Sequence, residues 1–129
     1  MIRGRVTGAL DPVVELGLKK GDTITAIPAV IDTGFSGMVC LAERYLEQIA
    51  LTFRFIERYE LANGDVVAQD VFEGHIVFDG QEQEVELIVT NSNDTLIGAA
   101  LLQNYTLTIN YPGQQVRLTR NRRRTRRPA

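Results

Sequence analysis

The 129-residue sequence contains no tryptophan, one histidine and one cysteine. The single cysteine, Cys40, cannot form a disulfide within the chain, which agrees with a reducing compartment. Because Cys40 lies in an apolar stretch, we expect it to be a small buried hydrophobe rather than a nucleophile. The lone histidine, His75, has no neighbouring cysteines or acids at metal-ligand spacing. We therefore expect a surface or strand-pairing residue there, no metal site and no other cofactor.

Long hydrophobic runs are absent as well. Uncharged apolar stretches such as residues 26–31 are far shorter than the roughly 20 residues that span a bilayer. Arg3 and Arg5 near the start are not followed by the apolar segment of a secretion signal. We therefore expect a cytoplasmic protein without membrane contact, and the chain length favours one compact domain.

Charge is divided unevenly along the chain. Residues 1–116 carry 7 Lys or Arg and 16 acids, a net charge of −9, whereas residues 117–129 carry 7 Arg and no acid. We predict a folded domain over residues 1–118 and a disordered, arginine-rich tail over residues 119–129, since like charges repel and little can be buried there. The tail could attract nucleic acid by counterion release. It could equally be a solubilising extension that draws back to the acidic domain, and no nucleic-acid motif elsewhere supports the first alternative.

Short strands dominate the predicted secondary structure. Turn signals such as Asn63-Gly64 and Asp79-Gly80 separate runs rich in Val, Ile, Thr, Phe and Tyr, which is typical of antiparallel strands. The predicted strands span residues 13–19, 23–32, 58–62, 66–72, 75–78, 84–90, 106–111 and 115–118. Pro28 in the second of these cannot donate to a ladder, so it implies an edge, a bulge or a break. Two short helices are predicted, at residues 42–50 and 98–104.

One acidic residue, Asp32, follows an apolar run at residues 28–31 and precedes a glycine-rich turn. A carboxylate at the end of a buried strand loses hydration and must be paired, hydrogen-bonded or partly protonated. This placement predicts a perturbed acid, and such acids are candidates for catalysis. The alternative is a turn or helix-capping aspartate without chemistry, which the local sequence also fits.

Three segments occur in the order of a known family. Residues 29–34, Ala-Val-Ile-Asp-Thr-Gly, resemble the active-site motif of the retropepsin-like (clan AA) aspartic proteases, the single-lobe relatives of pepsin. Leu96-Ile97-Gly98, followed by a helical stretch, is similar to the family's motif of two hydrophobic residues and a glycine. The hairpin around Asn63-Gly64 occupies the place of the family's flap. The resemblance covers residues 13–118 and implies a mostly β fold, a closed single-lobe β-barrel of the acid-protease type with one or two short helices.

The resemblance also implies a chemistry. Asp32 would be catalytic, and because the motif occurs once, an active enzyme would be a homodimer in which two Asp32 carboxyls activate a water against a peptide or protein substrate. Thr33 would hydrogen-bond across the dimer axis, and Gly34 would let the two active-site loops approach. The Leu96-Ile97-Gly98 segment would support the loop by packing, and the Asn63-Gly64 hairpin would form the flap.

The sequence departs from the retroviral pattern beside the motif. Phe35 stands where a small residue usually follows, so it either fills a substrate subsite or closes the cleft. Ser36-Gly37 and Ala99 stand where the retroviral enzymes commonly place an acid and an arginine that pair. Because the acid and the arginine are both absent, neither is left as an unpaired charge. This joint absence favours a bacterial or cellular branch of the family. The hairpin tip also lacks the glycine-rich sequence of viral flaps.

Two functions are compatible with these residues. The first is a homodimeric aspartic endopeptidase that uses Asp32 from each chain as shared acid and base. The second is a catalytically weak or inactive retropepsin-like module that dimerises or holds a partner, for example through the basic tail. The two differ in whether replacing Asp32 abolishes peptide cleavage.

Overall fold

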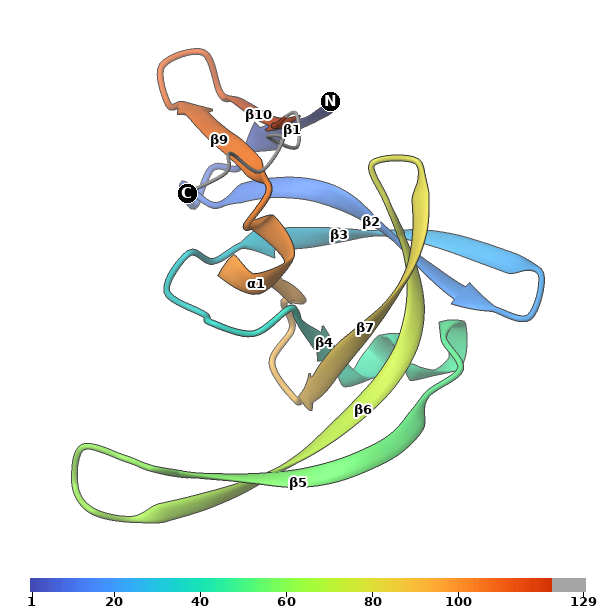
Figure 1. The fold of residues 1–129 in the computed structure, drawn as a ribbon. Coiled ribbons are helices and arrows are strands. Elements are labelled where there is room, and N and C mark those ends of the chain that lie inside the picture. The colour runs from blue at the N-terminus through green and yellow to red at the C-terminus, as the bar shows by residue number, and fades with distance from the viewer. Residues whose placement is uncertain (122–129) are drawn as a thin grey trace, which may run out of the picture.

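Ten β-strands and two short helices make up the described part of the molecule. The computed structural model describes residues 1–121, and residues 122–129 of the predicted tail lie outside the described residues. The prediction of a mostly β fold with one or two short helices is confirmed (Figure 1). The helices are the 3-10 helix η1 (Glu43–Gln48) and α1 (Ala99–Leu102), and no helix within residues 1–121 is long and apolar enough to cross a membrane. The strands are β1 (Ile2–Val6), β2 (Pro12–Lys20), β3 (Thr23–Ile31), β4 (Val39–Ala42), β5 (Thr52–Glu60), β6 (Val66–Phe78), β7 (Gln81–Thr90), β8 (Leu96–Ile97), β9 (Tyr105–Asn110) and β10 (Gln115–Arg120).

All ten strands belong to one sheet, in the order β5-β6-β7-β4-β8-β3-β2-β1-β10-β9. Neighbouring strands are antiparallel except for β3 with β8 and β4 with β7, which are parallel. An additional pairing of β6 with β2, at Val77 with Gly17 and at Ile76 with Leu18, joins the two ends of a six-strand circuit. Inward side chains from β2, β3, β8, β4, β7 and β6 can therefore share one core.

The core follows the alternation of the strands. In β2, Leu16 and Leu18 are fully buried while the residues between and beside them are more exposed, because successive side chains of a strand point to opposite faces. The largest fully buried side chains are Phe78, Leu16, Leu18, Leu41, Ile76, Leu87, Ile97 and Leu118. Buried Thr95 accepts a hydrogen bond from the Ala42 N–H at 3.1 Å, so its hydroxyl is satisfied within the core.

Several strand boundaries differ from the prediction. Neither β1 nor β4 was among the predicted strands, since both are short and take their hydrogen bonds from β10 and β7, which are distant in sequence. The predicted strands at 66–72 and 75–78 form the single strand β6, because Gly74 continues the ladder opposite Val85. Strand β5 begins at Thr52, well before the predicted strand at 58–62. Both predicted helices are present but shorter.

Pro28 lies at a local edge of the sheet. Strand β3 runs through it without interruption, and Pro28 faces Glu15 of β2. The N–H of Val30 points away from β2 and donates to the Thr95 carbonyl at 2.8 Å, so the nitrogen of Pro28, two residues earlier, faces the same side. Strand β8 begins only at Leu96, opposite Val30, so the missing N–H of Pro28 costs no ladder bond.

The last strand continues past the predicted domain boundary at residue 118. Thr119 and Arg120 pair with Thr106 and Tyr105 of β9. Asn121 then donates its backbone N–H to the Asn104 carbonyl at 2.8 Å. The ladder to β9 thus extends the folded part to residue 121, because β9 offers partners that a local reading of the arginine-rich sequence does not reveal.

Truncating Leu16 to alanine is expected to lower the free energy of unfolding by about 2–5 kcal/mol, because the side chain is fully buried and the cavity cannot close. The control is Val66→Ala, since Val66 is 68% exposed. It should change stability by less than about 0.5 kcal/mol. Urea unfolding followed by circular dichroism measures both variants, and equal losses would contradict the assigned core.

Candidate active site

The structure brings together the two segments that carry the predicted site. Strand β3 ends at Ile31, which pairs in parallel with Ile97 of β8. The backbone N–H of the next residue, Asp32, donates to the Ile97 carbonyl at 2.9 Å. Leu96-Ile97-Gly98 therefore lies directly beside the start of the Asp32-Thr33-Gly34 turn, although more than sixty residues separate them in sequence.

Asp32 is half-buried rather than enclosed. One carboxylate oxygen, Oδ1, accepts a hydrogen bond from the Gly34 N–H at 2.9 Å. The Phe35 N–H donates to the Asp32 carbonyl at 3.1 Å, which closes the turn. Thr33 and Gly34 are exposed. Strand β3 ends at Ile31, one residue before the end of the predicted strand, so Asp32 is the first residue of the turn, and its carboxylate is hydrogen-bonded there.

The rest of the loop is fixed to the start of α1. The N–H groups of Gly98, Ala99 and Ala100 donate to carbonyls of the loop. The acceptors are Met38 at 3.0 Å, Phe35 at 2.8 Å and Gly37 at 3.2 Å, respectively. Three backbone hydrogen bonds thus position the loop without using any side-chain charge.

Phe35 packs onto two glycines. A Cβ at Gly98 would lie 2.6 Å from a ring carbon of Phe35 and would also collide with the Gly37 carbonyl. A Cβ at Gly37 would lie 2.5 Å from the far end of the same ring. The aromatic ring thus fills the space above Gly37 and Gly98, and the Ala99 N–H bonds to the carbonyl of the same Phe35. Phe35 is half-buried there and forms one wall of a groove.

That groove lies between the loop and the hairpin formed by β5 and β6, and its volume is about 790 Å³. Residues of the loop and β4 form one side, residues 57, 59, 69 and 71 of the hairpin form another, and residues 86–88 of β7 complete it. A space of this size accommodates several side chains of an extended peptide. The groove begins beside the loop that carries Asp32, at Phe35.

Asn63 and Gly64 lie at the tip of this hairpin, as predicted. Gly64 has a φ of 89°, a value that glycine adopts without strain. The turn is closed by the Leu61 N–H, which donates to the Asp65 carbonyl at 2.7 Å, and Asn63 accepts a side-chain hydrogen bond from the Asp65 N–H at 3.0 Å. Figure 1 shows β5 and the first half of β6 extending away from the other strands as a long arm.

The hairpin exposes an unusual number of apolar side chains. Every residue of β5 is exposed, and the large exposed hydrophobics of the hairpin are Phe53, Phe55, Ile56, Tyr59, Leu61 and Val66. An isolated two-stranded hairpin is only marginally stable in water. An apolar surface of this kind marks an interaction site. The run of aromatic and β-branched residues at 52–59 is the sequence signal for the longer hairpin, whose first strand begins at Thr52 rather than at residue 58.

Cys40 is buried, as predicted. It lies in β4 and pairs with Leu96 of β8. Burial raises the pKa of its thiol, and the negative charge of Asp32 raises the pKa further. A thiol with a raised pKa is a weak nucleophile at neutral pH. Cys40 therefore has a packing role, and the pKa of its thiol depends on the charge of Asp32.

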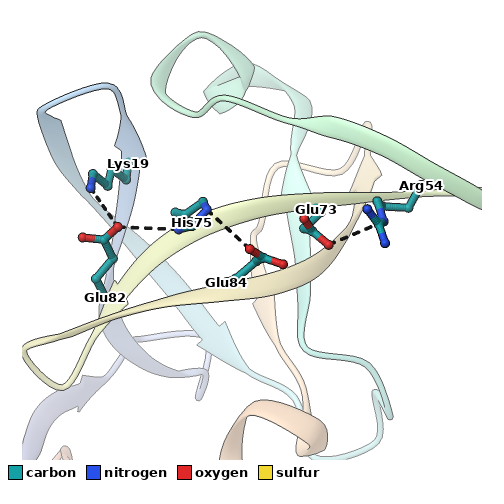
Figure 2. A network of polar contacts seen from close by, with 6 residues as sticks. All are labelled: Lys19, Arg54, Glu73, His75, Glu82 and Glu84. Atoms are coloured by element: carbon teal, nitrogen blue, oxygen red, sulfur yellow. Dashed lines mark hydrogen bonds and ion pairs between the residues drawn. The ribbon is translucent and has the colours of Figure 1, made fainter.

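His75 lies on the exposed face of β6, outside the candidate site (Figure 2). Its ring nitrogens are 3.5 Å from Glu82 and 3.7 Å from Glu84, and Lys19 contacts Glu82 at 2.7 Å. The hydrogen bond from Lys19 lowers the pKa of Glu82. Pairs this exposed add little stability. Across residues 1–121, no group of three histidine, cysteine or acidic side chains could hold a metal ion.

Gly98→Ala is expected to destabilise the protein by about 1–3 kcal/mol, because the added Cβ has no room between Gly37 and Phe35. Gly8→Ala is the matched control, since a Cβ there meets nothing within 4 Å. Thermal unfolding compares the two variants. If both lose the same stability, the loop does not pack against Gly98 as described.

Asp32→Asn is expected to lower the pKa of the Cys40 thiol, because it removes the nearby negative charge, while burial still keeps that pKa above its ordinary value. The thiolate fraction at a given pH then rises, and alkylation by iodoacetamide becomes faster. Alkylation rates measured against pH test this, with Asp22→Asn as a control at an exposed turn. A rate that Asp32→Asn leaves unchanged would argue against the electrostatic contact.

Of three comparisons with known proteins, the comparison with solved structures finds similar chains. A scan against models of protein families finds no match, and a search of curated proteins also finds none. Among solved structures, the solution structure of the simian foamy virus (mac) protease is similar, with 20% sequence identity and a TM-score of 0.49. The alignment covers 70% of this chain and 91% of the viral chain. At this identity the likeness concerns only the course of the backbone.

Proposed function

We propose that this protein is an aspartic-type endopeptidase that cleaves peptides or proteins as a homodimer, with Asp32 of each chain in the active site. The observation that supports this most directly is the half-buried Asp32 at the rim of β3. Backbone bonds from Gly34 and to Ile97 hold it in place, and Phe35 to Met38 of the same loop line a groove large enough for a peptide. A lone turn aspartate without chemistry would need neither the anchored loop nor the groove.

Each chain supplies one half of the proposed site. Hydrolysis of an amide by carboxyl groups needs one acid and one base together, and the motif around Asp32 occurs once. A two-fold dimer places the same residue twice at its axis. Thr33 and Gly34 are exposed, which leaves the loop available for a second copy. Thr33 would hydrogen-bond across the axis, and Gly34 would allow the close approach.

Two Asp32 carboxyls a few ångströms apart would share one proton, since two adjacent negative charges repel. The ionised carboxylate takes a proton from a water held between them, while the protonated carboxyl polarises the peptide carbonyl. The water oxygen bonds to the carbonyl carbon and forms a tetrahedral diol. Proton transfer to the amide nitrogen then lets the carbon–nitrogen bond break, which releases an acid and an amine.

The other predicted residues support this arrangement. Leu96 and Ile97 hold the loop through β8, and Gly98 lets Phe35 pack. The Asn63-Gly64 hairpin would close over an extended substrate as a flap, and its exposed apolar side chains would then be covered by the substrate or the second copy. A cytoplasmic location is part of the proposal, since a lone buried cysteine agrees with a reducing compartment.

Asp32→Asn is expected to abolish cleavage of a peptide library between acid and neutral pH, because neither copy could then ionise at residue 32. The variant should keep its circular dichroism spectrum, since Asn preserves the shape of the turn. Asp22→Asn, at an exposed turn away from the loop, should remain fully active. Parent and Asp32→Asn proteins that are equally inactive would favour a module that binds partners without cleaving them.

The dimer makes a separate prediction about concentration. Below the dissociation constant of the dimer, the cleavage rate should rise with the square of the protein concentration, because two chains form each site. Sedimentation velocity at the same concentrations should show the monomer converting to a dimer. A rate that stays proportional to concentration, with a monomer throughout, would contradict a shared site.

A further inference from the structure

The groove beside the candidate active site is acidic. Among the described residues that line it, Glu57 of β5 and Glu86 of β7 are the only charged ones, and the remaining walls are apolar or neutral. Both glutamates are exposed, and neither pairs with a cation from residues 1–121. The groove therefore combines apolar contact surface with two carboxylates that a basic ligand could pair.

A second hollow continues from this groove. Its volume is about 280 Å³, and Met38 and Ala100 line both spaces. Its other walls include Gln83, Tyr105 and Arg120. Strand β7 also contributes to both spaces, with Gln83 in the hollow and Glu86 in the groove. The two spaces are therefore neighbours: the hollow borders β10 through Arg120, and the groove borders the hairpin through Glu57.

The described part of the chain ends next to this hollow. Asn121 is tied to Asn104 by a backbone hydrogen bond of 2.8 Å, and its side-chain oxygen accepts a hydrogen bond from the Thr106 hydroxyl at 2.8 Å. Asn104 and Arg120 both line the hollow. Asn121 is therefore fixed next to the hollow, through its bonds to Asn104 and Thr106.

The segment that follows has the chemistry to fill the groove. Residues 122–129 include five arginines and no acid, whereas residues 1–116 carry a net charge of −9. Fully extended, the six residues 122–127 reach up to about 20–22 Å. This is about one and a half times the radius of gyration of roughly 13–14 Å for a domain of this size. Length and charge therefore both permit the segment to reach Glu57 and Glu86.

We propose that the arginine-rich segment 122–127 binds within its own chain in the groove, where its guanidinium groups pair with Glu57 and Glu86. Arginine suits this site because its stem packs on apolar walls while its planar head pairs with a carboxylate. Tethering at Asn121 gives the segment an effective concentration in the millimolar range. The binding requires no cleavage, so it is independent of the proposed protease activity. If that activity exists, the segment competes with peptide substrates.

The first test compares the backbone NMR spectra of the full chain and a variant in which the five arginines of residues 122–127 are replaced by serine. Both carry Asp32→Asn, so that no cleavage can intervene. The differences should concentrate at groove residues such as Met38, Tyr59 and Gln69, and they should shrink at high salt. They should not depend on protein concentration. Differences spread over other acidic surfaces, or differences that grow with concentration as a second copy would cause, overturn the proposal.

The second test measures binding of a labelled peptide, Arg-Arg-Arg-Thr-Arg-Arg-Pro-Ala, by fluorescence anisotropy in the same background. The serine variant should bind it at least about tenfold more tightly than the parent, whose groove the tethered segment already occupies. In the serine variant, Glu57→Gln and Glu86→Gln should each weaken binding by about two- to fivefold.

Glu15→Gln is the matched control for these substitutions, because Glu15 is an exposed acid of β2 outside the groove. It should leave peptide binding unchanged. Equal binding to parent and serine variant, or an equal loss for Glu15→Gln, would show general charge attraction and overturn the proposal. Melting temperatures of the glutamine variants, which should match the parent, exclude unfolding as the cause of any loss.

Discussion

Strand β8, only two residues long, holds both ends of the loop that carries Asp32. The Ile97 carbonyl accepts the Asp32 N–H at 2.9 Å where the loop begins, and the next residue, Gly98, donates to the Met38 carbonyl at 3.0 Å where it ends. Because both ends are fixed to adjacent residues, the loop cannot shift without breaking the parallel pairing of β3 with β8. The Ile31–Ile97 pair is buried, and Thr95 just before β8 satisfies the Ala42 N–H within the core. The position of the acid therefore depends on core packing.

The same arrangement explains how the loop is stabilised without an ion pair. Phe35 covers Gly37 and Gly98, and backbone N–H groups at the start of α1 satisfy the loop carbonyls. A buried ion pair must offset the desolvation of two charges, and apolar packing of similar volume is often as stable. The ring needs glycine at both contact positions, so these residues form one packing unit. Phe35 in turn shapes the groove wall, which links loop stability to whatever the groove binds.

Two features have no role in packing the core: the exposed apolar side chains of the hairpin and the positive charge of the tail sequence. The hairpin carries exposed aromatic and β-branched side chains on an arm with little burial, and such a surface is costly in water unless something covers it. The tail concentrates positive charge beyond an acidic domain. The hairpin borders the groove through Glu57 and Tyr59. Arg120, the last residue of β10, lines the neighbouring hollow, which shares Met38 and Ala100 with the groove.

The sequence by itself determined the mostly β class, the hairpin turn at Asn63-Gly64, the division of charge and the residues of the candidate site. These follow from local rules, since alternation, turn propensity and a short motif are encoded by neighbouring residues. Only the tertiary structure decided that β1 and β4 are strands, that Asp32 stands half-exposed at the rim, and that Glu57 and Glu86 share one groove. Each of these depends on partners far away in the chain, and hydrogen bonds between distant strands leave no local signal in a sequence.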